Sequence, residues 1–156
     1  MPEDECDSPA AGVMPSGTLI AFDFGHRRIG VAVGQTLTGT ANALQVVAVA
    51  GAGAPDWQAI SVIIKDWKPA ALVVGLPLGV DGEETEMSRA ARQFARQLES
   101  RYQLQVLFED ERLTSFSAEQ RFVAARARGS LRRKDAALKD AMAAQIILEI
   151  WLGSAP

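Results

Sequence analysis

The sequence predicts an α/β fold in which a mixed five-stranded sheet is flanked by helices. Three short apolar runs of strand length come first in the chain, and amphipathic helical segments then alternate with two further apolar runs. A length of 156 residues, 48% of them hydrophobic, suits one domain with a sizeable core. The expected order, β-β-β-α-β-α-β-α-α, joins a three-stranded antiparallel meander to two parallel strands.

The meander is expected in the first third of the chain. Residues 18–24 (TLIAFDF) form a β-favouring apolar run that ends at Gly25. A short polar turn leads to residues 29–34 (IGVAVG), so the two runs predict an antiparallel hairpin. Residues 43–49 (ALQVVAV) extend the meander as its third strand.

The hydrophobic period then changes to that of a helix. Residues 56–67 space their apolar side chains three and four apart, which predicts an amphipathic helix. Residues 71–75 (ALVVG) predict a buried strand, and residues 76–82 form a loop rich in turn-forming residues. Residues 87–98 carry a second helical stripe.

The last part of the chain predicts one more strand and two helices. Residues 105–108 predict the fifth strand. A helix is expected to begin after Thr114 or Ser115 as its N-cap. A basic loop over residues 126–134 then leads to a strongly apolar helix over about residues 136–152.

The charge is unevenly distributed along the chain. Residues 1–17 mix acids with Pro, Gly and Ser without an apolar period, so we expect a flexible acidic leader and one folded domain over residues 18–156. The formal charge is −3, yet residues 1–8 alone carry −4. Between Arg89 and Lys139 there are twelve Lys or Arg residues against six acids. The basic C-terminal half therefore suits a polyanionic partner.

The composition excludes several kinds of site. One cysteine and one histidine leave no disulfide framework, no cysteine-based or multi-histidine metal site, and little material for a serine or cysteine triad. No window reaches the roughly 18 to 20 apolar residues of a membrane span, and the acidic N-terminus is unlike a signal peptide. We expect a cytoplasmic protein with no membrane partner, whose chemistry depends on carboxylates.

Acidic side chains occur at three informative places. Asp23 interrupts the first strand near its end, where a partly desolvated carboxylate needs a cation or a hydrogen-bond donor, such as the backbone amides of the next turn. The acidic triplet of residues 109–111 follows the fifth strand and favours a divalent cation, or else a solvated turn paired with Arg112. Asp140 shares an apolar stripe of the last helix, although an acid there also complements the helix dipole.

Taken together, the three elements can each present a carboxylate at one edge of one sheet, where the carboxyl ends of parallel strands form sites in α/β folds. Two hard cations about 3.5–4 Å apart, held by such carboxylates, support in-line phosphoryl chemistry without a histidine base. The carboxylates therefore predict hydrolysis of phosphodiester bonds with two hard divalent cations.

Four segments in order resemble the YqgF (RuvX-like) family, bacterial proteins described as Holliday junction resolvases and as pre-16S rRNA processing nucleases with an RNase H-like fold. The segments are GTLIAFDFGHRRIGVAVG with TGTA just after it, VVGLPLGVDG, DERLTS and KDAMAAQIIL, and they span about Gly17 to Leu152. The chain has His26-Arg27 where the family often has Thr-Lys, and Ser115 where it has a second Thr. These changes keep cationic donors and the hydroxyl.

The resemblance implies that Asp23, Glu111 and Asp140 are the catalytic residues and metal ligands, with Asp110 as an alternative or supporting ligand. Gly75 and Pro77 would shape the loop beside the site. The basic run beside Asp140 is expected to bind phosphates rather than to be an ordinary solvated loop. His26 is more readily explained as a solvent-facing residue than as a general acid or base. The expected nucleic-acid contacts are Arg27, Arg28, Arg112, Thr114, Arg126, Arg128, Arg132, Arg133 and Lys134.

The implied function is that of a Mg²⁺- or Mn²⁺-dependent nuclease in 5′ maturation of pre-16S rRNA. Three alternatives stay open at this point. A Holliday junction resolvase would need two active sites and hence a dimer, whereas the sequence predicts a monomer or weak dimer. A phosphotransferase is suggested by Asp-Phe-Gly at a strand end, which resembles the phosphate loop of the actin and sugar-kinase group, but that group needs two domains. The third is a non-catalytic RNA-binding module.

Overall fold

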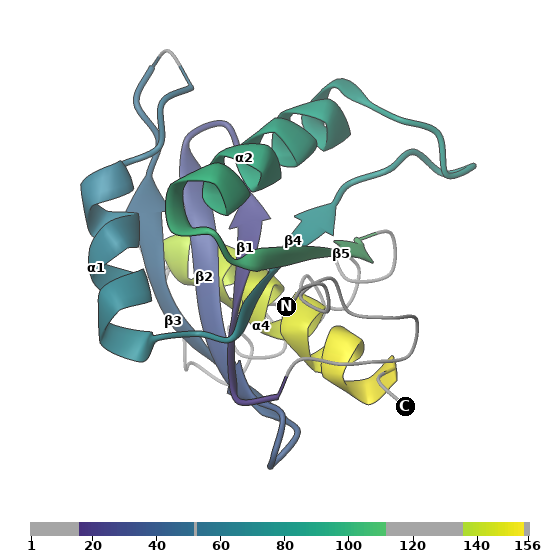
Figure 1. Cartoon of the computed structure of the whole chain (residues 1–156). Coiled ribbons are helices and arrows are strands. Elements are labelled where there is room, and N and C mark those ends of the chain that lie inside the picture. Colours follow the sequence, from purple (N-terminus) through teal and green to yellow (C-terminus); the bar gives the residue numbers. More distant parts are fainter. Residues whose placement is uncertain (1–15, 52, 112–135, 155–156) are drawn as a thin grey trace, which may run out of the picture.

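The computed structural model describes residues 16–51, 53–111 and 136–154 (Figure 1). Most of the predicted acidic leader, the helix expected after Thr114 or Ser115 and the basic loop lie outside these residues. The described elements are β1 (Thr18–Phe24), β2 (Arg28–Gln35), β3 (Thr40–Ala48), α1 (Trp57–Trp67), β4 (Ala71–Leu76), α2 (Glu86–Tyr102), β5 (Gln105–Asp110) and α4 (Ala136–Ser154).

The five strands form one mixed sheet in the order β3-β2-β1-β4-β5. Strands β1, β2 and β3 pair antiparallel, whereas β4 runs parallel to both β1 and β5. This arrangement confirms the prediction of a three-stranded meander joined to two parallel strands. It also places the carboxyl ends of β1, β4 and β5 at one edge of the sheet, where sites of α/β folds lie.

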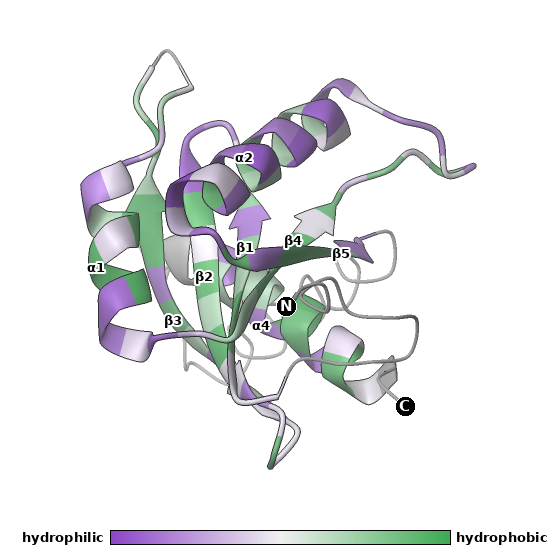
Figure 2. Cartoon of the chain, viewed as in Figure 1, coloured by the Kyte–Doolittle hydropathy of each residue, from purple (hydrophilic) through white to green (hydrophobic). Residues whose placement is uncertain are grey.

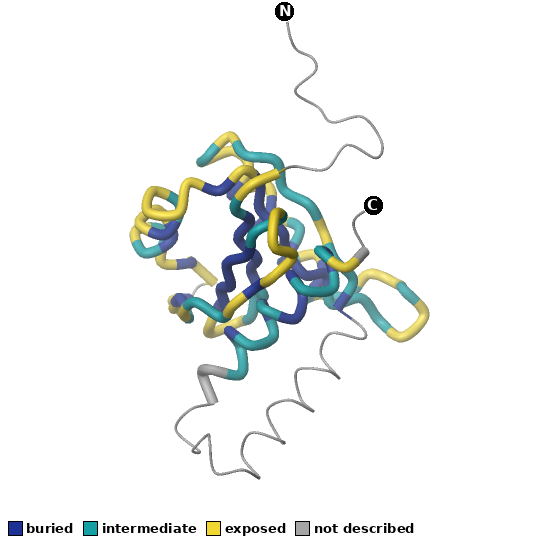
Figure 3. Tube along the Cα trace, turned by 90° about the horizontal axis from the view of Figure 1, so that it is seen from below, coloured by how far each residue is buried: buried dark blue, intermediate teal, exposed yellow. Residues whose placement is uncertain are grey.

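Helices cover both faces of the sheet (Figure 1). Helices α1 and α2 pack on one face, where they share an apolar cluster with Ile20 and Phe22 of β1. Helix α4 covers the other face, where its residues pack with Leu19 and Ala21. In Figure 2 the central strands are mostly apolar while α2 is largely hydrophilic, and Figure 3 shows the buried strands at the centre of the molecule. The side chains of β1 therefore alternate between two cores.

Local capping fixes where α1 and α2 begin. The Asp56 side chain accepts a hydrogen bond from the backbone N–H of Ala59 at 3.1 Å, which makes Asp56 the N-cap of α1. Thr85 and Ser88 form a capping box at the start of α2, in which each side chain accepts from the other residue's backbone N–H. These caps agree with the helix starts that the periodicity predicts.

Strand β5 is longer than the sequence predicts. The prediction ends it at Phe108, but its parallel pairing with β4 continues through Glu109 and Asp110. The physical reason is that β4 itself extends to Leu76 and offers further backbone partners. Two residues of the acidic triplet therefore belong to the strand, and only Glu111 follows it. The alternative of a solvated acidic turn is wrong for Glu109 and Asp110.

Helix α4 crosses the meander on the face opposite α1 and α2 (Figure 1). Its predicted stripe is confirmed, since Ala144, Ile147 and Trp151 are buried. None of the helices that the structure describes is both long enough and apolar enough to cross a membrane.

Candidate active site

Asp23 lies at the end of β1 on the face that α4 covers. Side chains alternate along a strand, so Asp23 shares this face with Leu19 and Ala21, both fully buried under α4. This confirms the predicted face. Asp23 pairs in register with Gly30 of β2, and its own side chain is partly buried.

Asp140 reaches this neighbourhood because the first turns of α4 rest directly on β2. A Cβ atom at Gly30 would overlap the Asp140 carbonyl oxygen and lie 2.9 Å from the Ala141 nitrogen. Only glycine leaves room for a helix backbone at this distance from the strand. Because Gly30 is the register partner of Asp23, the close approach brings the start of α4 next to the end of β1.

Glu111 is held beside β4 immediately after β5 ends. Its backbone N–H donates a hydrogen bond to the Leu76 carbonyl oxygen at 3.0 Å. Its side chain is only 6% exposed and lies over Gly75, where a Cβ atom would stand 2.5 Å from Oε2. Gly75 thus makes space for the carboxyl group, as expected of a residue that shapes the site. Glu111 Oε2 is buried without a hydrogen-bond partner, an arrangement that is costly unless a ligand compensates it.

Asp23 and Glu111 interact directly and share a proton. Burial, the charge of Asp23 and a hydrogen bond to Asp23 together raise the pKa of Glu111 to about 9, with burial as the largest cause. Burial also raises the pKa of Asp23 to about 6; the hydrogen bond from Glu111 opposes this rise, and the charge of Asp140 adds to it. At neutral pH the pair therefore holds one proton, with Glu111 donating to the Asp23 carboxylate.

The Asp23–Glu111 pair fits a hard divalent cation. It offers only oxygen ligands, one of which lacks a partner, and the repulsion between its carboxylates is the kind that a bound cation relieves. Within the described part of the chain, no three acidic, histidine or cysteine side chains are gathered closely enough to hold an ion. The carboxylate of Asp140 is engaged elsewhere, so the structure brings two of the three predicted ligands together and keeps the third nearby.

Asp140 forms an ion pair with Arg28. The distance from Arg28 Nε to Asp140 Oδ2 is 2.7 Å, and the side chains are 49% and 30% exposed, respectively. Exposed ion pairs contribute little to stability and exchange partners readily. Arg28 is therefore accessible to a phosphate that approaches the carboxylates, and its role as a nucleic-acid contact stays a prediction.

The geometry favours Glu111 over Asp110 as the acid that faces Asp23. Alternation along β5 directs Asp110 to the opposite face of the sheet, while Glu109 and Glu111 point to the face of α4. Asp110 acts at a distance, since its charge contributes to the raised pKa of Glu111. Burial, followed by the charge of Asp110, also raises the pKa of Glu109.

The remaining predicted site residues fall into two groups. His26 and Arg27 are exposed in the turn between β1 and β2, and His26 lines a pocket on the face opposite the acids, which agrees with a solvent-facing residue. Pro77 shapes the loop after β4, where its carbonyl oxygen accepts from the Thr85 hydroxyl at 2.9 Å. The others lie outside the described residues and stay predictions: Arg112, Thr114, Arg126, Arg128, Arg132, Arg133 and Lys134.

Sequence reasoning missed two features of this site. One is Gly30, whose signal was available: a glycine inside an apolar strand marks a place where another backbone can approach closely. The other is the ion pair between Arg28 and Asp140, which joins residues 112 positions apart. No local pattern could have indicated that pair.

The raised pKa values predict how stability depends on pH when no metal is bound. The pKa of Glu111 is raised from 4.5 to about 9, and that of Asp23 from 3.8 to about 6. Because the folded state then binds more protons than the unfolded state, stability falls as the pH rises across this range. We expect the melting temperature in EDTA to fall steadily from about pH 5 to about pH 9. Glu111→Gln should remove most of this slope and melt several degrees higher at about pH 8.

Thermal unfolding followed by circular dichroism measures this effect, and Glu99→Gln on the exposed side of α2 is the matched control. A Glu111→Gln protein that keeps the wild-type slope would show that the pair does not hold the proton.

Comparisons with known proteins find similar chains over nearly the whole length of this one. A family model named RuvX and described as Holliday junction resolvase matches residues 17–154. A protein of Xanthomonas oryzae pv. oryzae named "Putative pre-16S rRNA nuclease" is 48% identical over 147 residues, 94% of each chain. A protein of the same name from Xanthomonas campestris pv. campestris is 49% identical over 149 residues, 95% of each chain.

Among solved structures, RuvC of T. thermophilus in complex with a Holliday junction substrate has a similar fold. The TM-score is 0.52 at 17% sequence identity, and the match covers 89% of this chain and 98% of that one. The likeness confirms the RNase H-like fold that the sequence predicts.

Proposed function

The chain belongs to the RuvX family, and from that premise we propose that it is a divalent-cation-dependent nuclease acting in 5′-end processing of pre-16S rRNA. Its similarity to nucleases over nearly the whole chain confirms the prediction of an enzyme that hydrolyses phosphodiester bonds. The observation that carries the proposal is the contact of Asp23 with the buried Glu111, whose Oε2 has no hydrogen-bond partner.

We assign the cation to Asp23 and Glu111, with Asp140 as the third carboxylate. A bound Mg²⁺ or Mn²⁺ would lower the pKa of a water molecule and neutralise charge on the phosphate. The chain's own residues do the rest. Asp23 and Glu111 supply buried anionic oxygens once their shared proton is lost. Arg28, paired with Asp140 through Nε, offers its remaining guanidinium N–H groups to a phosphate oxygen.

The choice of RNA as substrate follows the sequence relatives. Both Xanthomonas proteins carry a name that refers to pre-16S rRNA, and both are about half identical to this chain. The family description supports a second candidate, cleavage of a Holliday junction. Since the proposed substrate is a ribosomal RNA precursor, we expect the protein to act in the cytoplasm, as a monomer or weak dimer.

A cleavage panel separates these functions. Labelled pre-16S 5′-leader RNA, unrelated single-stranded RNA and a four-way DNA junction are incubated with the protein and Mg²⁺ or Mn²⁺. We expect the leader RNA to be cut and EDTA to stop the reaction, while light scattering finds a monomer at micromolar concentration. Preferential cutting of the junction by a dimer would favour the resolvase. Cleavage of none of the three substrates would contradict a nuclease and leave an RNA-binding module.

A further inference from the structure

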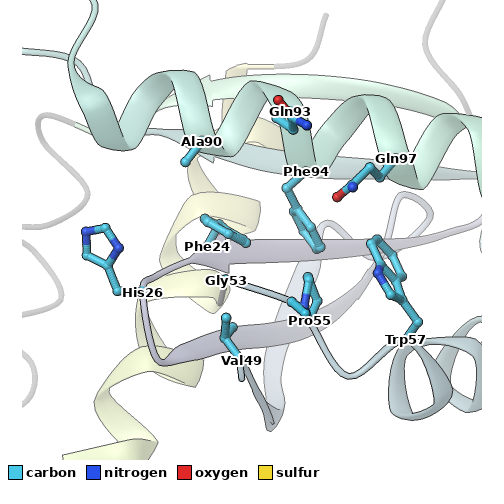
Figure 4. Close-up of a pocket in the computed structure, with 11 residues that line it drawn as sticks. Phe24, His26, Val49, Gly53, Pro55, Trp57, Ala90, Gln93, Phe94 and Gln97 are labelled. Atoms are coloured by element: carbon cyan, nitrogen blue, oxygen red, sulfur yellow. The ribbon is translucent and has the colours of Figure 1, made fainter. Parts of the chain in front are cut away.

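A pocket of about 490 Å³ lies at the same end of the sheet as the acids but on the opposite face (Figure 4). Strand β1 links the pocket to the acidic site. Asp23 belongs to the acidic site on one face of the sheet, and the next residue, Phe24, lines the pocket on the other face. The other lining residues come from the β1–β2 turn, the segment between β3 and α1, the first residue of α1, and α2; those used below are His26, Trp57, Ala90, Gln93, Phe94 and Gln97.

Aromatic rings form one wall of this pocket. Phe94 comes down from α2 with Phe24 on one side and Trp57 on the other, at ring-centroid distances of 4.9 and 5.6 Å (Figure 4). Phe94 is 1% exposed, so it belongs to the core, whereas Phe24 and Trp57 are only partly buried. Both rings line the pocket, so a planar ligand that enters it packs against Phe24 and against the part of Trp57 that the Arg101 guanidinium leaves uncovered.

Polar side chains stand beside this aromatic wall. Gln93 and Gln97 are exposed on successive turns of α2, and each carries an amide that both donates and accepts hydrogen bonds. His26 adds a ring with further polar atoms at the β1–β2 end (Figure 4). Nucleobases present donors and acceptors on their edges around a flat apolar face, which matches this combination of groups.

Positive charge flanks the pocket at both ends. Next to the pocket along α2 lies a second hollow of about 430 Å³. The two hollows share Gln93 and Gln97, and the second is also lined by Arg96 and Arg101. The Arg101 guanidinium lies 4.1 Å from the centre of the Trp57 ring. At the other end, exposed Arg27 follows His26. Cations on both sides of a pocket with one aromatic wall suit a base with its two flanking phosphates.

We propose that this pocket binds an unpaired nucleobase of the nucleic-acid substrate, stacked on the wall formed by Phe24 and Trp57. The inference rests on the proposed nuclease function and specifies its substrate: the strand that is cut must present an unpaired nucleotide near the scissile phosphate. A strand that passes over the β1–β2 turn can place a phosphate at the acids and a base in the pocket. A base that is paired in a duplex cannot enter.

The test measures binding without cleavage. The full-length protein in EDTA is titrated into a short single-stranded RNA carrying one 2-aminopurine, whose fluorescence is quenched on stacking, and into the same RNA in a duplex. We expect quenching with the single strand only. Trp57→Leu removes a stacking ring, Gln97→Ala removes an amide, and Ala90→Leu fills the pocket; each should weaken binding about tenfold. Gln58→Ala, exposed on α1 outside the pocket, should bind as the wild type does.

Thermal unfolding of each variant verifies that it is folded, and Gln97→Ala and Ala90→Leu leave all the aromatic rings in place. Wild-type binding and quenching by all three pocket variants would overturn the proposal, as would equal quenching by the duplex. The nuclease is judged separately by the cleavage panel. Quenching of 2-aminopurine without cleavage of any substrate would support the base pocket and contradict the nuclease function. Cleavage of RNA without quenching would support the nuclease function and contradict the base pocket.

Discussion

Asp23→Asn and Glu111→Gln should each lower kcat/KM for RNA cleavage by about a hundredfold or more, while both proteins remain folded. The physical reason is that each change replaces an anionic oxygen ligand by a neutral amide in a buried site, where a cation's contribution of several kcal/mol is lost. Since both acids destabilise the metal-free fold at neutral pH, the loss of activity should accompany an unchanged or higher melting temperature.

Asp110→Asn and Glu99→Gln are the informative companions to these variants. Asp110 lies on the opposite face of β5 and should affect cleavage less than Glu111, through its charge alone. Glu99 is exposed on α2 and should have no effect. Steady-state kinetics on the labelled leader RNA measures all four. An Asp110→Asn protein as inactive as Glu111→Gln would mean that Asp110 is the ligand, and full activity in Glu111→Gln would exclude the assigned site.

Gly30→Ala should be the most destabilising single change in the sheet. The added Cβ atom would overlap the Asp140 carbonyl oxygen, and backbone cannot move aside as the end of a side chain can. We expect a loss of about 3 kcal/mol in the free energy of unfolding, equivalent to a melting temperature roughly 10 °C lower. The displaced start of α4 should also reduce cleavage, because Asp140 moves with it.

Gly153→Ala is the matched control, since a Cβ atom at Gly153 in the last turn of α4 meets nothing within 4 Å. It should be neutral or slightly stabilising. Chemical denaturation of the two variants beside the wild type provides the comparison. A Gly30→Ala protein as stable as Gly153→Ala would mean that α4 does not rest on β2 as described.

The order of the elements and the faces of β1 were predictable because they depend on local periodicity. Asp23 lies two and four residues after Ala21 and Leu19, and side chains at this spacing in a strand point to the same face. This alternation alone determines which core Asp23 faces. The pairing of β4 with β5 was less predictable. Glu109 and Asp110 belong to β5 because they pair with Gly75 and Leu76 of β4, a strand far away in sequence. The residues of the acidic triplet themselves do not indicate this tertiary pairing.

The details of the site depend on contacts between distant residues. The sequence indicates three carboxylates at one sheet edge, but the partner of each is decided by packing. Gly75 makes space for Glu111, Gly30 admits the start of α4, and Arg28 takes the carboxylate of Asp140. The aromatic pocket escaped prediction for the same reason, since Phe24, Trp57 and Phe94 come from three separate elements.

The central claim is that the Asp23–Glu111 pair exchanges its shared proton for a divalent cation. Isothermal titration of Mn²⁺ into the protein at about pH 7, in two buffers of different ionisation enthalpy, measures both binding and proton release. We predict that the wild type binds Mn²⁺ and releases about one proton. Glu111→Gln should show neither Mn²⁺ binding nor proton release. Absence of Mn²⁺ binding to the wild type, or equally tight binding to Glu111→Gln, would contradict it.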